Sequence, residues 1–114
     1  MPKVLIMEDE FFLADDCEKE ARRAGLEVAG PFATLGDAKA RIRDGLKVDA
    51  ALIDINLVGE AVYPLLDELI RDGLPIVIYT GYDRSHLPQR FQRLPLYLKP
   101  ENCSRAVAHL KRLL

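Results

Sequence analysis

Short apolar runs alternate along the chain with longer stretches in which apolar residues recur every three or four positions. The runs predict strands over residues 3–7, 27–30, 50–53, 75–79 and 96–98. The stretches predict helices within residues 12–25, 34–45, 62–73 and 103–114, and a short one within 83–95. Because most of the strands lack polar alternation, both sheet faces are expected to be covered. The pattern therefore predicts an α/β fold, a doubly wound, five-stranded parallel sheet flanked by helices.

Local signals mark where several of these elements begin and end. Thr34, three residues before Asp37, predicts the cap of the second helix, and Pro64 fits only the first turn of the third. A loop containing Gly59 is expected before that third helix.

Two other helices have apolar positions that predict which face is packed. In the first helix these are Phe12, Leu13, Cys17 and Ala21, and in the last they are Cys103, Val107, Leu110 and Leu114. In the short segment 83–95 they are Leu87, Phe91 and Leu94, with Ser85 as the expected cap and Pro88 near the helix start.

Length and composition indicate one soluble domain over residues 1–114. The chain is 49% hydrophobic and 30% charged, with a formal net charge of −2. The first apolar run is too short for a signal peptide or a spanning helix, so we expect a cytoplasmic protein without membrane association. The interspersed charges predict no direct nucleic-acid binding.

The two cysteines, Cys17 and Cys103, fall within apolar helical patterns and have no metal-like spacing. We expect reduced core thiols without a function.

Polar side chains follow four of the predicted strands. They are Glu8 and Asp9 after the first, Asp54 after the third, Thr80 at the end of the fourth and Lys99 after the fifth. In doubly wound sheets, ligands bind beyond the carboxyl ends of the strands. Taken singly, Asp54 is better read as a loop cap and Glu8 with Asp9 as acids that favour a helix N-terminus.

Charge repulsion favours a joint role for these residues. Two carboxylates about 4 Å apart repel by about 4 kcal/mol at an effective dielectric near 20, so three on one rim need a counter-ion. Oxygen ligands in a partly open loop suit Mg²⁺. Asp54 is then a natural nucleophile toward a phosphoryl group, with Lys99 offsetting charge and Thr80 donating a hydrogen bond.

Four segments, residues 4–10 (VLIMEDE), 52–57 (LIDINL), 78–81 (IYTG) and 98–100 (LKP), together resemble the response-regulator receiver domain of two-component signalling. The resemblance spans the chain and implies a flavodoxin-like fold with phosphorylation on Asp54. It implies Mg²⁺ bound by Asp9, Asp54 and the backbone carbonyl of Asn56, with Glu8 acting through a water. Lys99 would pair with Asp54 or its phosphate, often before a cis peptide to Pro100, and Thr80 would shift toward the phosphate.

The implied function is that of a bacterial phosphoacceptor switch, not an enzyme. Its phosphoryl donor would be a sensor histidine kinase or a phosphotransfer protein. The downstream protein target, homodimer formation and the presence of an output module in the full protein stay open. The resemblance also places the side chains of Asn56 and Tyr82 beside the path of hydrolytic water, as a gate on phosphate lifetime.

Two departures from the usual receiver pattern are present. Leu96 stands where most receivers have the aromatic switch residue, so the usual coupling to Thr80 is in question, and Tyr97 should face the other way. Residues 75–82 (PIVIYTGY) resemble the FAT GUY receivers at Pro75, Thr80, Gly81 and Tyr82 but not at three positions between them. That subgroup contains many stand-alone receivers, and it also tends to lack the aromatic switch residue.

Two rival functions compete with the switch. A phosphate-independent pseudo-receiver that acts as a protein-binding module is disfavoured because the acids, Thr80 and Lys99 are all retained. A Mg²⁺-dependent phosphatase with an aspartyl nucleophile would need a second acid two residues after Asp54, where the chain has Asn56.

Overall fold

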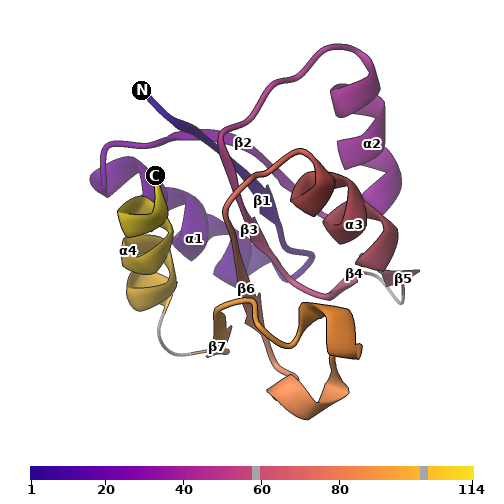
Figure 1. Cartoon of the computed structure of the whole chain (residues 1–114). Coiled ribbons are helices and arrows are strands. Elements are labelled where there is room, and N and C mark those ends of the chain that lie inside the picture. Colours follow the sequence, from indigo (N-terminus) through magenta and orange to yellow (C-terminus); the bar gives the residue numbers. More distant parts are fainter. Residues whose placement is uncertain (58–59, 101–102) are drawn as a thin grey trace.

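A five-stranded parallel sheet forms the centre of the protein in this computed structural model (Figure 1). The structure describes residues 1–57, 60–100 and 103–114, and only the backbone of Asn56 and Glu60. In spatial order the strands are β2 (Glu27–Phe32), β1 (Lys3–Met7), β3 (Ala50–Ile53), β6 (Ile76–Thr80) and β7 (Leu96–Leu98). All four neighbouring pairs are parallel, so the predicted doubly wound α/β fold is confirmed.

Helices cover both faces of this sheet. On one face lie α1 (Phe11–Arg23) and α4 (Cys103–Leu113), and on the other lie α2 (Leu35–Arg43) and α3 (Tyr63–Arg71) (Figure 1). Successive residues of β1 therefore enter different cores: Ile6 packs toward α1 and α4, and Leu5 packs toward α2 and α3. Burial on both faces explains why the central strands are apolar at every position.

Two of the predicted helix starts are confirmed. The Thr34 hydroxyl accepts a hydrogen bond from the backbone N–H of Asp37 at the start of α2, and Pro64 lies in the first turn of α3. The cap of α1 was not predicted, because glutamate is an uncommon capping residue. It is Glu10, whose carboxylate accepts from the N–H groups of Phe12 and Leu13.

The short helix predicted within residues 83–95 is wrong. The chain instead makes two 3-10 turns, Arg84–His86 and Gln89–Phe91, separated by Pro88, which has no backbone N–H to donate. Asp83, not Ser85, caps the first turn.

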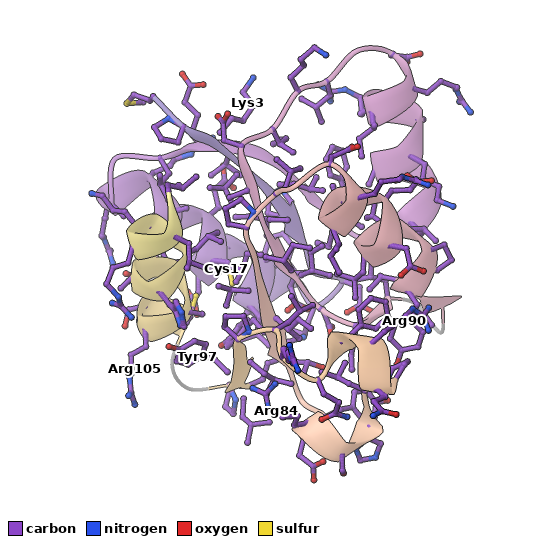
Figure 2. The ribbon with its side chains drawn as sticks, viewed as in Figure 1. Lys3, Cys17, Arg84, Arg90, Tyr97 and Arg105 are labelled. Carbon is purple, nitrogen blue, oxygen red and sulfur yellow. The ribbon has the colours of Figure 1, made fainter. Side chains whose placement is uncertain are left out.

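Side-chain hydrogen bonds add to the 3-10 backbone hydrogen bonds that hold this segment together (Figure 2 labels Arg84). The Arg84 guanidinium donates to the carbonyl groups of Gln92 and Leu94, and the Gln92 amide donates back to the Arg84 carbonyl. The predicted packing of Leu87 and Phe91 is nevertheless confirmed, since both are buried.

Two predicted core positions are also wrong. Phe12 is 74% exposed because it lies in the first turn of α1, on the solvent side with Phe11. Leu114 is 44% exposed because it follows the last residue of α4.

The loop expected before α3 contains two short antiparallel strands, β4 (Asn56–Leu57) and β5 (Glu60–Ala61). Leu57 of β4 and Val62, the residue after β5, are both fully buried, and no local pattern signalled the burial of Leu57. The predicted role of Gly59 in this connection falls outside the described residues.

Among the described residues, no helix combines the length and the apolar character that crossing a bilayer would require.

Gly30 is the position in the sheet where the backbone most needs a glycine. Its φ is +102°, and a Cβ there would lie 2.7 Å from the Phe32 nitrogen and 2.9 Å from the Ile6 carbonyl oxygen. We predict that Gly30→Ala lowers the free energy of unfolding by roughly 2–4 kcal/mol, through strain and overpacking. Gly36→Ala is the matched control, because its Cβ would meet nothing, and it should raise stability by at most about 1 kcal/mol. Urea unfolding measures both, and equal midpoints would contradict the assignment.

Candidate functional site

The register of the sheet brings the polar strand ends to one edge. Met7 pairs with Ile53, and Ile53 pairs with Ile78, so Glu8 and Asp54 leave adjacent strands side by side. Thr80 pairs with Leu98, and the Lys99 N–H donates to the Thr80 carbonyl oxygen at 2.8 Å. The strand-end argument thus placed these residues at the correct edge.

The Lys99 ammonium joins two of the acids directly. Its Nζ lies 2.8 Å from Asp54 Oδ2 and 2.6 Å and 2.8 Å from the two carboxylate oxygens of Glu8. The side chains of Lys99, Asp54 and Glu8 are 14%, 6% and 2% exposed, respectively. In this environment the charges attract one another more strongly than a surface pair would.

The positions of Glu8 and Lys99 shift their proton affinities. Burial raises the pKa of Glu8, although hydrogen bonds from Lys99 and from the Glu10 backbone N–H oppose the rise. Burial alone would lower the pKa of Lys99, but its hydrogen bonds to Asp54 and Glu8 outweigh burial and raise it. Lys99 therefore stays a cation at neutral pH.

The acids are placed to hold a metal ion. One carboxylate oxygen from each of Glu8, Asp9 and Asp54 lies within 4.8 Å of the others. When ionised, these three acids outnumber the Lys99 cation, which leaves net negative charge. In addition, Glu8 Oε1 is buried without a hydrogen bond of good geometry within the described part of the chain. Such a donor set fits a hard divalent cation of the Mg²⁺ kind.

The remaining predicted residues lie around this cluster. Thr80 is fully buried, and its hydroxyl lies 3.4 Å from the Tyr82 N–H that donates to it. Tyr82 is 40% exposed, with its ring 5.1 Å from the His86 ring. The Asn56 backbone pairs with Ala61, while its side chain falls outside the described residues, so its predicted roles stay predictions.

The two β7 residues in question point to opposite sides, as predicted. Leu96 packs into the core beneath α2 and α3, and Tyr97 packs toward α1 and α4. The Tyr97 hydroxyl lies 2.8 Å from His109 Nδ1 on α4 (Figure 2 labels Tyr97). Tyr97 is thus engaged on the face away from Leu96. The expected cis peptide between Lys99 and Pro100 is present.

One contact near the site was not predicted from the sequence. The Tyr79 hydroxyl donates to the Pro100 carbonyl oxygen at 2.9 Å, which ties β6 to the chain just after Lys99. The sequence pattern identifies Tyr79 only as a strand residue, because the 21-residue separation of the two partners leaves no local signal.

Comparisons with known proteins agree with this geometry. No protein-family model and no curated protein sequence matches the chain. Solved structures do match: SdrG from Sphingomonas melonis Fr1 is 31% identical, with a TM-score of 0.80 and 97% coverage of each chain. The receiver (REC) domain of the PhyR response regulator from Erythrobacter litoralis is 25% identical, with a TM-score of 0.79, covering 98% of this chain and 89% of that one.

The likeness extends to more distant proteins. TrrA from Thermotoga maritima, a response regulator solved in complex with Mg²⁺-BeF, is 19% identical with a TM-score of 0.80 and covers the whole of both chains, which shows the shared fold. By its 31% identity to SdrG over 97% of each chain, together with its likeness to the PhyR receiver domain, the chain belongs to the response-regulator receiver family, and its role is that of a two-component receiver. Membership of the FAT GUY subgroup stays a prediction.

The acidic cluster generates a prediction about metal affinity. A carboxylate beside a divalent cation contributes several kcal/mol to the free energy of binding at an effective dielectric near 20. A difference of about 1.4 kcal/mol changes the affinity tenfold. We predict that Asp9→Ala raises the Kd for Mg²⁺ about tenfold or more, without loss of stability. Asp72→Ala, which removes an exposed acid at the far end of α3, is the matched control. Calorimetric Mg²⁺ titration that gave both variants the wild-type Kd would rule out the site.

Proposed function

We propose that the protein is a phosphoacceptor switch, in which Asp54 takes a phosphoryl group from a phosphohistidine of a sensor histidine kinase or phosphotransfer protein. The observation that carries this proposal is the contact of Lys99 with both Asp54 and Glu8 in a largely buried cluster at the carboxyl edge of the sheet. A loop-capping aspartate would not need a buried cation from a strand two positions away.

The chemistry assigned to Asp54 is a phosphoryl transfer. One Asp54 carboxylate oxygen attacks the phosphorus, a P–O bond forms, and the P–N bond to the donor imidazole breaks. The imidazole nitrogen keeps the electron pair and takes up a proton. Lys99 supports this step because its ammonium already lies 2.8 Å from Asp54 and can move to the phosphoryl oxygens.

Asp9, Asp54 and the backbone carbonyl of Asn56 are proposed to hold Mg²⁺, with Glu8 acting through a water. When bound, the ion would offset negative charge on the phosphoryl group and on the acids. The Lys99 ammonium and the Glu10 N–H both donate to Glu8 Oε2, which keeps that carboxylate oriented toward the same cluster.

Thr80 is proposed to report the modified state. It is fully buried at the end of β6, next to the strand that Asp54 follows, so its hydroxyl can donate to a phosphoryl oxygen after a short movement. Thr80 accepts from the Tyr82 N–H, and such a movement would alter the chain that leads into the 3-10 turns.

A relative supports a phosphate-like activation. SdrG has also been solved in a BeF3-activated conformation, and that structure is 30% identical to this chain with a TM-score of 0.76. BeF3 has the shape and charge distribution of a phosphoryl group, so we propose the same kind of activation here.

The decisive prediction concerns Asp54→Asn. Incubation of the wild-type protein with Mg²⁺ and acetyl phosphate should add the mass of one phosphoryl group. The side-chain amide of the variant cannot act as the nucleophile, so modification should fall to zero. Intact-mass spectrometry measures the change. Asp72→Ala should be modified like the wild type.

Each alternative function has its own outcome in this experiment. A pseudo-receiver would leave the wild-type mass unchanged under all conditions. A phosphatase would release many equivalents of free phosphate per protein molecule without a lasting mass gain. A switch would instead retain one phosphoryl group on each protein molecule. An undiminished mass gain in Asp54→Asn would move the acceptor to another residue.

Tyr82 is proposed to limit the lifetime of the phosphate. With Ile55, Ala61, Tyr63 and His86 it lines a hollow of about 160 Å³, and Ile55 is the residue after Asp54. Hydrolysis requires an in-line water, and a ring over this approach would slow its entry.

We therefore predict that Tyr82→Ala speeds loss of the phosphoryl group several-fold while leaving its uptake intact. Tyr82→Phe keeps the ring and should decay at the wild-type rate, which separates bulk from hydrogen bonding. A time course of mass loss at fixed Mg²⁺ measures all three proteins, and a common decay rate would refute the gate.

A further inference from the structure

The two cysteines, separated by 86 positions in the sequence, meet in the folded protein. Cys17 on α1 and Cys103 at the start of α4 have their Sγ atoms 3.2 Å apart. Both are free thiols. Figure 2 shows Cys17 on the inner side of α1, between α4 and the sheet. A disulfide has an S–S length of about 2.05 Å, so the sulfurs need to approach by only roughly 1.2 Å.

The two thiols differ in their access to solvent. Cys17 is fully buried, whereas Cys103 is only partly buried. Cys103 also lines an open hollow of about 340 Å³ between α1 and α4, together with Asp16, Lys19, Glu20, Arg23 and Ser104. A small oxidant can therefore reach Cys103 directly, but it cannot reach Cys17 without opening the helix packing.

The two thiols also differ in acidity, in the direction that this access requires. The hydrogen bond with Cys17 lowers the pKa of Cys103, and the same contact raises the pKa of Cys17. Cys103 is moreover the first residue of the 11-residue helix α4, where the positive end of the helix favours a thiolate. The more accessible sulfur, that of Cys103, is thus the better nucleophile.

We propose that Cys17 and Cys103 form a peroxide-sensitive dithiol, with Cys103 as the attacking cysteine and Cys17 as the resolving one. The Cys103 thiolate attacks one oxygen of hydrogen peroxide, forming an S–O bond, and the O–O bond breaks to release hydroxide, which is protonated to water. Cys17 sulfur then attacks Cys103 sulfur, the S–S bond forms, and the S–O bond breaks with loss of a second water. The two thiols lose two electrons and two protons, and the peroxide gains them.

This disulfide would join two of the chain segments that supply residues to the phosphoacceptor site. Cys17 is on the helix that follows Glu8 and Asp9, and Cys103 comes four residues after Lys99. Tyr79, whose hydroxyl holds the Pro100 carbonyl, packs in the same core as Cys17. The modification is independent of Asp54 and can be tested whether or not phosphorylation occurs.

The experiment uses the reduced full chain treated with hydrogen peroxide, denatured and alkylated with N-ethylmaleimide. We expect intact mass to show loss of two hydrogen atoms and no alkylation, and dithiothreitol treatment to restore two alkylation sites. Trypsin should release peptides 4–19 and 94–105 as one linked species. Because the bond closes a long loop, the thermal midpoint should rise by on the order of 10 °C in the oxidised form.

Single variants assign the two roles. In Cys17→Ser, Cys103 should stop at a sulfenic acid that dimedone traps, and in Cys103→Ser, the buried Cys17 should stay reduced. Because Cys17→Ser can also unfold the core, the wild-type peptide map decides the proposal by itself. An intermolecular disulfide through Cys103, or a sulfinic acid on Cys103 beside a still-reduced Cys17, would overturn it.

Discussion

The contact of one ammonium with two carboxylates organises the functional end of this protein. Lys99 lies within hydrogen-bond distance of Glu8 and Asp54, and all three side chains are largely withdrawn from water. Removing one partner from a buried ion pair typically costs about 3–5 kcal/mol, because the other charge is left uncompensated. The same cluster has an excess of negative charge when its acids are ionised, since Asp9 adds a third carboxylate at the rim. Losing one of these charges would therefore be costly, and the excess of acids attracts a divalent cation, while the Lys99 ammonium can attract an anionic phosphoryl group.

Strand polarity is the constraint that places this cluster. In a parallel sheet all carboxyl ends lie at one edge, so residues distant in sequence meet without any need for long loops. The connections at that edge are where the structure departs from simple helices. The β4–β5 pair follows Asp54, and two 3-10 turns follow Thr80. Both are connections that follow a site residue in the sequence, and Tyr82 lies in the second of them.

The face of the sheet that α1 and α4 cover supports the site through packing. There α1 and α4 lie against each other and bury Cys17, with Cys103 partly exposed at the entrance between them. Each of these helices begins close in sequence to a site residue, α1 after Asp9 and α4 after Lys99. A covalent link between the helices would thus restrict the same two segments that must adjust when the site is charged or modified, which gives the proposed oxidation a route to the proposed signalling.

Pattern and spacing alone determined the sheet, its helices and the acids at its edge. Apolar runs report burial on both faces, and strand polarity fixes where Asp54 and Lys99 must lie. What the sequence could not supply are the contacts that depend on how separate elements pack. The burial predicted for Phe12 is wrong because Phe12 lies in the first turn of α1, five residues before Cys17, and so does not share the face of Cys17 and Ala21 that meets the sheet. The meeting of Cys17 with Cys103 escaped prediction for a related reason: each thiol alone looks like an ordinary core residue, and only the packing of α1 against α4 brings the two sulfurs within 3.2 Å.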